Sequence, residues 1–203
     1  MKQALLLAAL VLPLPLSAQI RPSLGVGRGV LQTDDLMADA YHVQAGAQLV
    51  RISDRASVRG EALYQQGTAN ASPLSCEQAR QAYCLGRTDE QRMLGGGVQV
   101  RIETVELTRG VRPYVVPAGL GVYHLRTESR ESEGCVPMGD LPACAPGPEF
   151  SRATSTTSVG WMMGAGLEAD VGRMRVFAEF RGHVMLVSGG ETGSVPFTVG
   201  LSL

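Results

Sequence analysis

The chain has 203 residues, a formal charge of −1 and 25 glycines. This length fits one domain, and the balanced charge gives no electrostatic reason to expect nucleic acid as a partner. Glycine exceeds its usual share of roughly 7% and occurs inside the apolar runs, which disfavours long helices. No segment after the N-terminal region reaches the roughly 20 apolar residues of a membrane-spanning helix.

The N-terminal segment has the pattern of a secretory signal peptide. Lys2 supplies a positive charge, Ala4–Leu16 form an apolar core, and the small residues Ser17–Ala18 follow. This order is typical of signal peptides, and the core is short for a spanning helix. We predict a signal peptide at residues 1–18 and one exported domain at residues 19–203. A membrane anchor or a buried N-terminal helix is the alternative interpretation.

Eight segments of the mature chain alternate between two kinds of residue with a period of two, which is the signature of strands. The predicted strands cover residues 23–32, 41–52, 56–67, 92–107, 111–126, 157–171, 173–187 and 195–203. Polar loops are predicted at 33–39, 68–90, 127–156 and 188–193, and short turns at 53–55, 108–110 and near Gly172. Long loops that alternate with short turns are typical of an up-and-down antiparallel barrel in a membrane.

The two faces of the last two predicted strands differ in character. One face is almost entirely apolar, and the other mixes charges, small residues and a few bulky apolar residues. In a membrane barrel the apolar face meets lipid and the polar face lines a narrow lumen. We therefore predict an all-β fold, an eight-stranded antiparallel up-and-down transmembrane β-barrel whose outer face contacts outer-membrane lipid.

Two segments, Pro113–Tyr123 and the alternating C-terminal strand Phe197–Leu203, carry a resemblance to a known family. They resemble the small eight-stranded outer-membrane barrels of Gram-negative bacteria, which include the OmpA transmembrane domain, OmpX and the opacity proteins. The resemblance covers the mature chain and implies an outer-membrane location. It also implies that the assembly machinery reads the C-terminal strand, although Leu203 stands where the family has an aromatic residue. We expect a monomer.

The alternation also places charges of both signs on the inward face: Arg59, Glu61, Arg101, Glu103, Glu168, Asp170, Arg175, Glu179 and Arg181. Charges far from water require partners, and side chains can fill an eight-stranded barrel. We predict a closed, salt-bridged lumen. A gated ion path, or a catalytic carboxylate with His183, is the alternative. Arg28 shares the outward parity of Leu24 and Val26, so we expect a bulge or a position near the rim.

Four cysteines lie in the two longest predicted loops as close pairs, Cys76 with Cys84 and Cys135 with Cys144. An exported protein meets an oxidising compartment, and four cysteines allow three connectivities. We expect the two local disulfides, which would brace the external loops. A zinc site is disfavoured because the spacings are wide and neither loop contains histidine. We predict no metal and no cofactor.

The sequence favours a role in envelope structure or surface interaction over catalysis, so we predict that the chain is not an enzyme. Two alternatives remain open. One is a soluble periplasmic carrier of lipocalin type that binds a small apolar ligand. The other is a lipid A-modifying barrel enzyme, which would need His and Ser on the outward face. Here His183 shares the inward face and Ser188 lies in a predicted loop.

Overall fold

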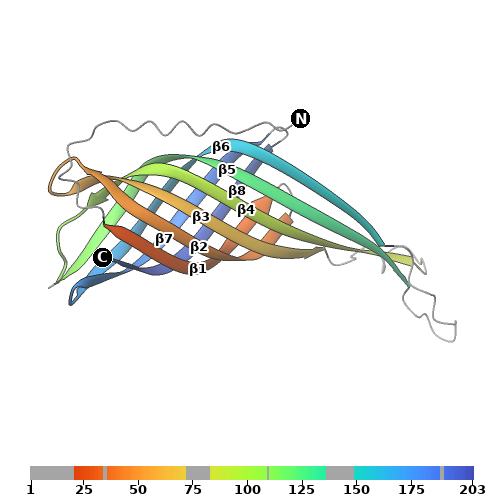
Figure 1. Ribbon diagram of the computed structural model, residues 1–203. Coiled ribbons are helices and arrows are strands. Elements are labelled where there is room, and N and C mark those ends of the chain that lie inside the picture. Colours follow the sequence, from red (N-terminus) through yellow and green to blue (C-terminus); the bar gives the residue numbers. More distant parts are fainter. Residues whose placement is uncertain (1–20, 34–35, 72–82, 109, 136–148, 188–189) are drawn as a thin grey trace.

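The computed structural model describes residues 21–33, 36–71, 83–108, 110–135, 149–187 and 190–203 (Figure 1). Its strands are β1 (Pro22–Thr33), β2 (Leu36–Arg51), β3 (Ala56–Ala71), β4 (Tyr83–Glu103), β5 (Val111–Cys135), β6 (Glu149–Val171), β7 (Met174–Val187) and β8 (Gly190–Ser202). Each strand pairs antiparallel with the next, and β8 pairs with β1. The predicted eight-stranded, up-and-down barrel is confirmed. The predicted signal peptide lies outside the described residues.

No helix among the described residues is long and apolar enough to cross a membrane.

The strands are staggered around the barrel. A line of paired residues that starts at Pro22 of β1 crosses all eight strands and returns to β1 at Gln32, ten positions further along. Such a stagger requires the strands to tilt by roughly 35–45° from the barrel axis. Neighbouring strands are therefore offset in height, which decides which side chains meet across the lumen.

The outward face of the barrel is apolar along its full circumference. Large apolar side chains are exposed on every strand, for example Leu24, Val43, Leu120, Trp161 and Phe197. On β4 the outward positions from Leu94 to Ile102 hold only apolar residues or glycine over nine residues. A tilted strand needs roughly 9–11 residues to cross a bilayer. This outer face has the character and height of a transmembrane barrel.

Several predicted loop boundaries were wrong because the strands are longer. The predicted loop 68–90 shrinks, since β3 reaches Ala71 and β4 begins at Tyr83. The predicted loop 127–156 shrinks likewise, since β5 reaches Cys135 and β6 begins at Glu149. The backbones of these polar extensions pair with neighbouring strands. Neither face of the extensions packs against lipid or against the lumen, so neither face requires apolar side chains. The alternation that predicts strands is therefore missing from them.

The shorter connections also differ from the prediction. Only residues 34–35 separate β1 from β2, and only residues 188–189 separate β7 from β8, so the predicted loops 33–39 and 188–193 were too long. In contrast, β4 ends at Glu103, and residues 104–110 form a longer turn than the predicted 108–110. The two longest connections therefore join β3 to β4 and β5 to β6.

The outer parts of β4, β5 and β6 form a sheet that extends beyond the closed barrel (Figure 1). We call residues Tyr83–Asp89, Ser129–Cys135 and Glu149–Arg152 the protruding sheet. Its central strand is β5, which pairs with β4 up to Tyr83 and with β6 up to Glu149. On one side of the barrel, this sheet therefore extends beyond the rim, at the end that carries the connections from β3 to β4 and from β5 to β6.

A bulge in β5 overturns part of the predicted face assignment. The period-two alternation of the predicted strand 111–126 puts Tyr114 and Val116 on the same outer face as Leu120 and Val122, but both side chains are buried inside the barrel. The register of β5 against β6 shifts between Val116 and Gly119, so Pro117 and Ala118 both point outward. Proline lacks the N–H that a ladder requires and is found at bulges, so Pro117 was the signal for this shift.

A charge placed in the middle of the apolar outer face should destabilise the barrel. Val98→Arg puts a guanidinium at the centre of the outward run of β4, and we expect a loss of about 2–4 kcal/mol in the free energy of unfolding. Urea titration of the protein folded into lipid vesicles measures it. Thr68→Arg is the control, since Thr68 is outward, exposed and paired with Glu90, and its effect should stay within about 0.5 kcal/mol. Equal effects would contradict the lipid-facing assignment.

Candidate functional site

A buried ionic cluster fills the lumen near the short-turn end of the barrel. Its centre is Arg181 of β7, which forms ion pairs with Glu61 of β3 and, at 2.5 Å, with Glu179. Glu179 also accepts hydrogen bonds from the Tyr114 hydroxyl at 3.0 Å and from the Gln44 amide at 3.4 Å. These side chains come from β2, β3, β5 and β7, so the cluster ties opposite walls of the barrel together.

A second group of ion pairs lies beside the first. Arg101 of β4 pairs with Glu168 of β6 at 2.5 Å, and both side chains are almost completely buried. The Arg101 guanidinium also lies 3.7 Å from the centre of the Tyr114 ring, which adds a cation–π contact. Tyr114 therefore joins the two groups, because its ring contacts Arg101 and its hydroxyl contacts Glu179.

The remaining predicted inward charges lie closer to the mouth. Arg175 bonds Glu168 at 3.3 Å and Asp170 at 2.9 Å, and Glu103 lies 3.6 Å from Arg101. The side chains of Arg175, Asp170 and Glu103 are partly exposed, so they line the opening of the lumen instead of its interior. Arg59 is buried, donates to Ser23 Oγ at 2.9 Å, and forms no ion pair with a described residue.

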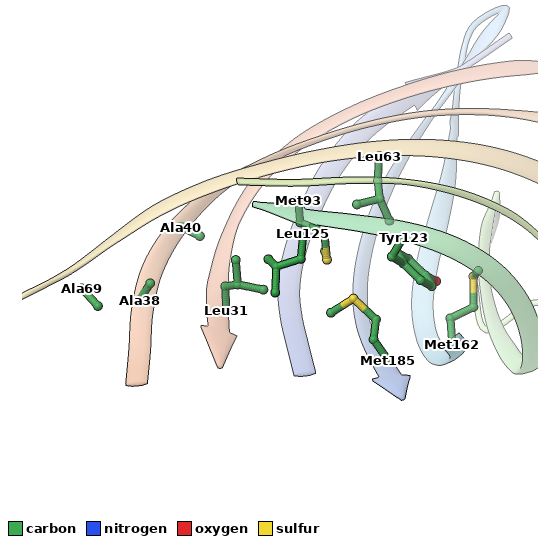
Figure 2. Close-up of a cluster of buried hydrophobic side chains, with 10 residues drawn as sticks. All are labelled: Leu31, Ala38, Ala40, Leu63, Ala69, Met93, Tyr123, Leu125, Met162 and Met185. Atoms are coloured by element: carbon green, nitrogen blue, oxygen red, sulfur yellow. The ribbon is translucent and has the colours of Figure 1, made fainter. Parts of the chain in front are cut away.

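An apolar layer lies in the lumen above the ionic cluster, toward the protruding sheet, and buried polar side chains such as His42, Gln65 and Gln91 lie among its members. Its apolar side chains are Leu31, Ala38, Ala40, Leu63, Ala69, Met93, Tyr123, Leu125, Met162 and Met185 (Figure 2). The order along β3 shows the change of layer, since inward Arg59 and Glu61 are followed by inward Leu63 and Ala69. The sequence prediction of a salt-bridged lumen, with a few bulky apolar residues on the same face, did not place those apolar residues in a layer of their own.

Little space remains inside the barrel. The cavity bordered by Gln44, Glu61, Arg101, Tyr114 and Arg181 measures about 20 Å³, close to the minimum that holds one water molecule. A larger hollow of about 470 Å³ lies only at the short-turn mouth. Charged pairs and apolar side chains thus occupy successive levels of the lumen.

The histidines do not form a catalytic constellation. His183 is buried in the lumen, where its Nδ1 lies 3.0 Å from the Tyr123 hydroxyl, and no described carboxylate hydrogen-bonds it. His124 is the outward histidine, and its Nδ1 lies 2.9 Å from Thr157 Oγ1 on β6. Nucleophile and base pairs normally include a third group that orients the base. No described side chain hydrogen-bonds the second nitrogen of His124.

The outer face carries a belt of charges just above the apolar band. Paired positions on β1 to β5 form one row: Arg28, Tyr41, Gln66, Arg92 and Arg126. The next row outward holds Val30, Asp39, Thr68, Glu90 and Glu128. Each arginine of the first row pairs with a carboxylate of the second, at 2.5 to 2.6 Å. We call these two rows the outer belt.

The outer belt explains Arg28 and marks where the lipid-facing surface ends. Arg28 is exposed, its guanidinium lies 5.2 Å from the centre of the Tyr41 ring, and its strand has no bulge, so the bulge explanation was wrong. Between the belt and the short turns, no outward position of a described strand carries a charge. Charged side chains on the lipid face cost less toward the interface. Because the two rows follow paired positions, they climb with the tilt of the strands, and the belt marks on each of β1 to β5 where the apolar outward run ends.

The cysteines can be placed only in part. Cys76 and Cys144 lie outside the described residues. Cys84 and Cys135 begin β4 and end β5, where Cys84 pairs with Gly134 and Cys135 pairs with Tyr83. The two local disulfides remain a prediction.

Comparison with known proteins bears on the fold. No protein-family model and no curated protein matches the chain. Among solved structures, Neisserial surface protein A (NspA) aligns with 14% identity over 91% of this chain and 96% of its own, with a TM-score of 0.52. Ail of Yersinia pestis aligns with 12% identity over 91% and 99%, and a major outer membrane protein from Thermus thermophilus with 9% over 90% and 98%, each with a TM-score of 0.48. The expected resemblance in fold to small outer-membrane barrels is confirmed.

Removal of Arg181 should strongly destabilise the barrel. Arg181→Met leaves the buried carboxylates of Glu61 and Glu179 without their cation, and breaking a buried pair costs about 3–5 kcal/mol. The measurement is the urea midpoint of the unboiled, faster-migrating form on a gel. Arg51→Met is the control, because Arg51 and its partner Asp54 are exposed and should contribute little. A midpoint for Arg181→Met equal to that of the control would show that the cluster does not stabilise the barrel.

The position of Tyr114 depends on a glycine of the neighbouring strand. A Cβ at Gly166 would lie 2.5 Å from Cζ and the hydroxyl of Tyr114 and 2.6 Å from the backbone oxygen of Ala178, so Gly166→Ala must displace the ring, the β7 backbone or both. We expect a loss of about 1–3 kcal/mol in unfolding free energy. Gly182→Ala tests the same change where the nearest atom is 4.0 Å away, and it should be nearly neutral. Chemical denaturation in detergent compares the two, and a neutral Gly166→Ala would refute the tight packing of Tyr114.

Proposed function

We propose that the chain is an outer-membrane protein whose closed barrel anchors the protruding sheet, and that this sheet serves surface interaction. The observation that carries the proposal is the projection of β4, β5 and β6 past the outer belt (Figure 1). A sheet with polar residues on both faces has no role in spanning lipid. It gives the protein a large, hydrogen-bonded surface in the aqueous space outside the membrane.

The predicted signal peptide and local disulfides support the same location. Export brings the chain to the envelope, and an oxidising compartment allows Cys76–Cys84 and Cys135–Cys144 to form. Both pairs would brace the segments next to the protruding sheet. The C-terminal strand, which pairs with β1 and β7, would be the segment that the assembly machinery recognises.

Transport and ligand carriage fit the geometry less well. A pore needs an open lumen, whereas side chains occupy this one at two successive levels. A lipocalin-like carrier needs an apolar interior and a wettable exterior, but here the exterior exposes Val26, Leu94 and Phe180 while Arg101 and Arg181 are inside. A lipid A-modifying enzyme needs an outward, oriented catalytic group; His183 is buried, and the outward His124 contacts Thr157 Oγ1 but has no described side chain that hydrogen-bonds its second nitrogen.

Envelope structure is the second candidate function. The outer belt supports it, because its paired arginines and carboxylates border the apolar outward runs and would meet polar groups at the lipid interface. This role would depend on the barrel wall and not on the protruding sheet. The two candidate functions therefore predict opposite results when the sheet is removed.

Trimming the protruding sheet separates the two functions. Glu128 and Ala153 pair directly, so an Asn-Gly turn can replace residues 129–152 as a two-residue hairpin that keeps Glu128 in the outer belt. In bacteria that express the trimmed chain, we expect heat-dependent gel mobility and detergent resistance to persist. Adhesion to a panel of immobilised host matrix proteins should fall to the level of cells without the chain.

Two controls make the result decisive. Surface proteolysis checks that the full chain exposes the sheet outside the cell. Cells that carry Thr68→Arg check that an unrelated outward substitution leaves adhesion unchanged. Adhesion that survives the trimming, together with detergent sensitivity in cells without the chain, would reject surface interaction in favour of envelope structure.

A further inference from the structure

The hollow at the short-turn mouth brings together charged side chains from many parts of the chain. It measures about 470 Å³, which is the size of a small-molecule site. Residues of β2, β3, β4, β5 and β7 border it, together with two of the turns and the residue before β1. Five of the bordering residues are arginines and three are carboxylates. The arginines are Arg21, Arg51, Arg55, Arg112 and Arg175.

The three carboxylates at the hollow already have partners. Asp54 lies 3.4 Å from Arg51, and Glu103 lies 3.6 Å from Arg101. Glu106 accepts a hydrogen bond from a backbone N–H of its own turn. A cation that entered the hollow would therefore have to displace an existing donor from each carboxylate.

The arginines at the hollow are less completely paired. Arg112 and Arg175 share the carboxylate of Asp170, at 2.8 and 2.9 Å. Arg21 and Arg55 form no ion pair with a described residue. When the ion-pair partners are counted with the bordering residues, six arginines stand against five carboxylates. The hollow therefore keeps a positive charge.

The two arginines without ion pairs have backbones that neighbouring strands hold in place. The Arg21 carbonyl accepts a hydrogen bond from the Gln48 N–H at 3.2 Å, and the Arg55 carbonyl accepts one from the Glu103 N–H at 2.7 Å. A guanidinium group presents a planar fork of donors that matches the oxygens of phosphate and carboxylate. Because the backbones of these arginines are already ordered, binding an anion costs less conformational freedom.

We propose that this hollow binds a small multivalent oxyanion, with Arg21 and Arg55 as its principal contacts. The short turns of outer-membrane barrels lie on the periplasmic side. The ligand would therefore be a periplasmic solute that carries several phosphate or carboxylate groups. The site lies at the end of the barrel opposite the protruding sheet, so it does not depend on the function proposed for that sheet.

Other occupants of the hollow fit less well. A divalent cation would meet the arginines, and the carboxylates that it needs are already paired. A second copy of the chain, mouth to mouth, would bring two sets of arginines together, and like charges repel. An acidic segment of another protein has suitable charge, but a hollow of about 470 Å³ has the size of a small molecule.

Calorimetric titration of the full chain in a non-ionic detergent tests the proposal. The probe is inorganic tripolyphosphate, and Ca²⁺ and a hexaglutamate peptide are the comparison probes. We expect tripolyphosphate to bind at one site and more tightly than either comparison probe. Added salt should weaken its binding, because charge pairs at an open mouth are screened.

Substitutions of opposite sign test the residues. Arg21→Gln combined with Arg55→Gln should weaken tripolyphosphate binding by about tenfold, the effect of two exposed charge pairs. The matched control is Arg130→Gln combined with Arg152→Gln, an equal charge change on exposed residues of the protruding sheet, which should leave binding unchanged. Asp54→Asn removes an exposed negative charge from the hollow and should strengthen binding by about two- to fivefold. Heat-dependent gel mobility checks that each variant is folded.

The outcomes distinguish this inference from its competitors and from the proposed function. Absence of tripolyphosphate binding, equal binding to the Arg21 and Arg55 variant, or an equal loss in the control would each overturn it. Binding of Ca²⁺ that Asp54→Asn abolishes would assign the hollow to a cation and overturn it. Tighter binding of hexaglutamate would assign the hollow to an acidic protein segment and also overturn it. Each of these failures leaves the adhesion experiment on the trimmed chain unaffected.

Discussion

The fold depends on one constraint, the need of every backbone N–H and C=O at membrane depth to find a partner inside the protein. A sheet meets this need only by closing on itself, and the pairing of β8 with β1 supplies the closure. Closure divides all side chains into an outward set that meets lipid and an inward set that must fit a narrow space. The period-two alternation in the sequence follows directly from that division.

The inward set meets a second constraint, since side chains from eight strands converge on one axis. Large residues therefore need glycine as neighbours, as Tyr114 does against Gly166. Charges in this space need partners, and Arg101 and Arg181 each have a carboxylate from a distant strand. The ion pairs and the apolar layer both fill this narrow space, the first with paired charged side chains and the second with apolar side chains.

The alternation was enough to predict eight strands and the inward Arg101, Glu168 and Arg181, because each of these residues lies in a strand with two distinct environments. It failed at Tyr114, where the bulge at Pro117 changes the parity without changing the composition. It also failed where the strands run past the lipid, because an extension with solvent on both faces shows no contrast between its sides. The ion pairs join strands that are distant in sequence, and the stagger decides which strands they join. The stagger is a property of the closed barrel, so no single segment of the sequence predicts it.

The layers that seal the lumen lie in the barrel, whereas the protruding sheet begins beyond the outer belt. No residue of the protruding sheet belongs to the ionic cluster or to the apolar layer. The side chains that fill the lumen and the strands that project from the barrel thus belong to separate parts of the chain. Substitutions or insertions in the protruding sheet can therefore change the projecting surface without disturbing the packing inside the barrel.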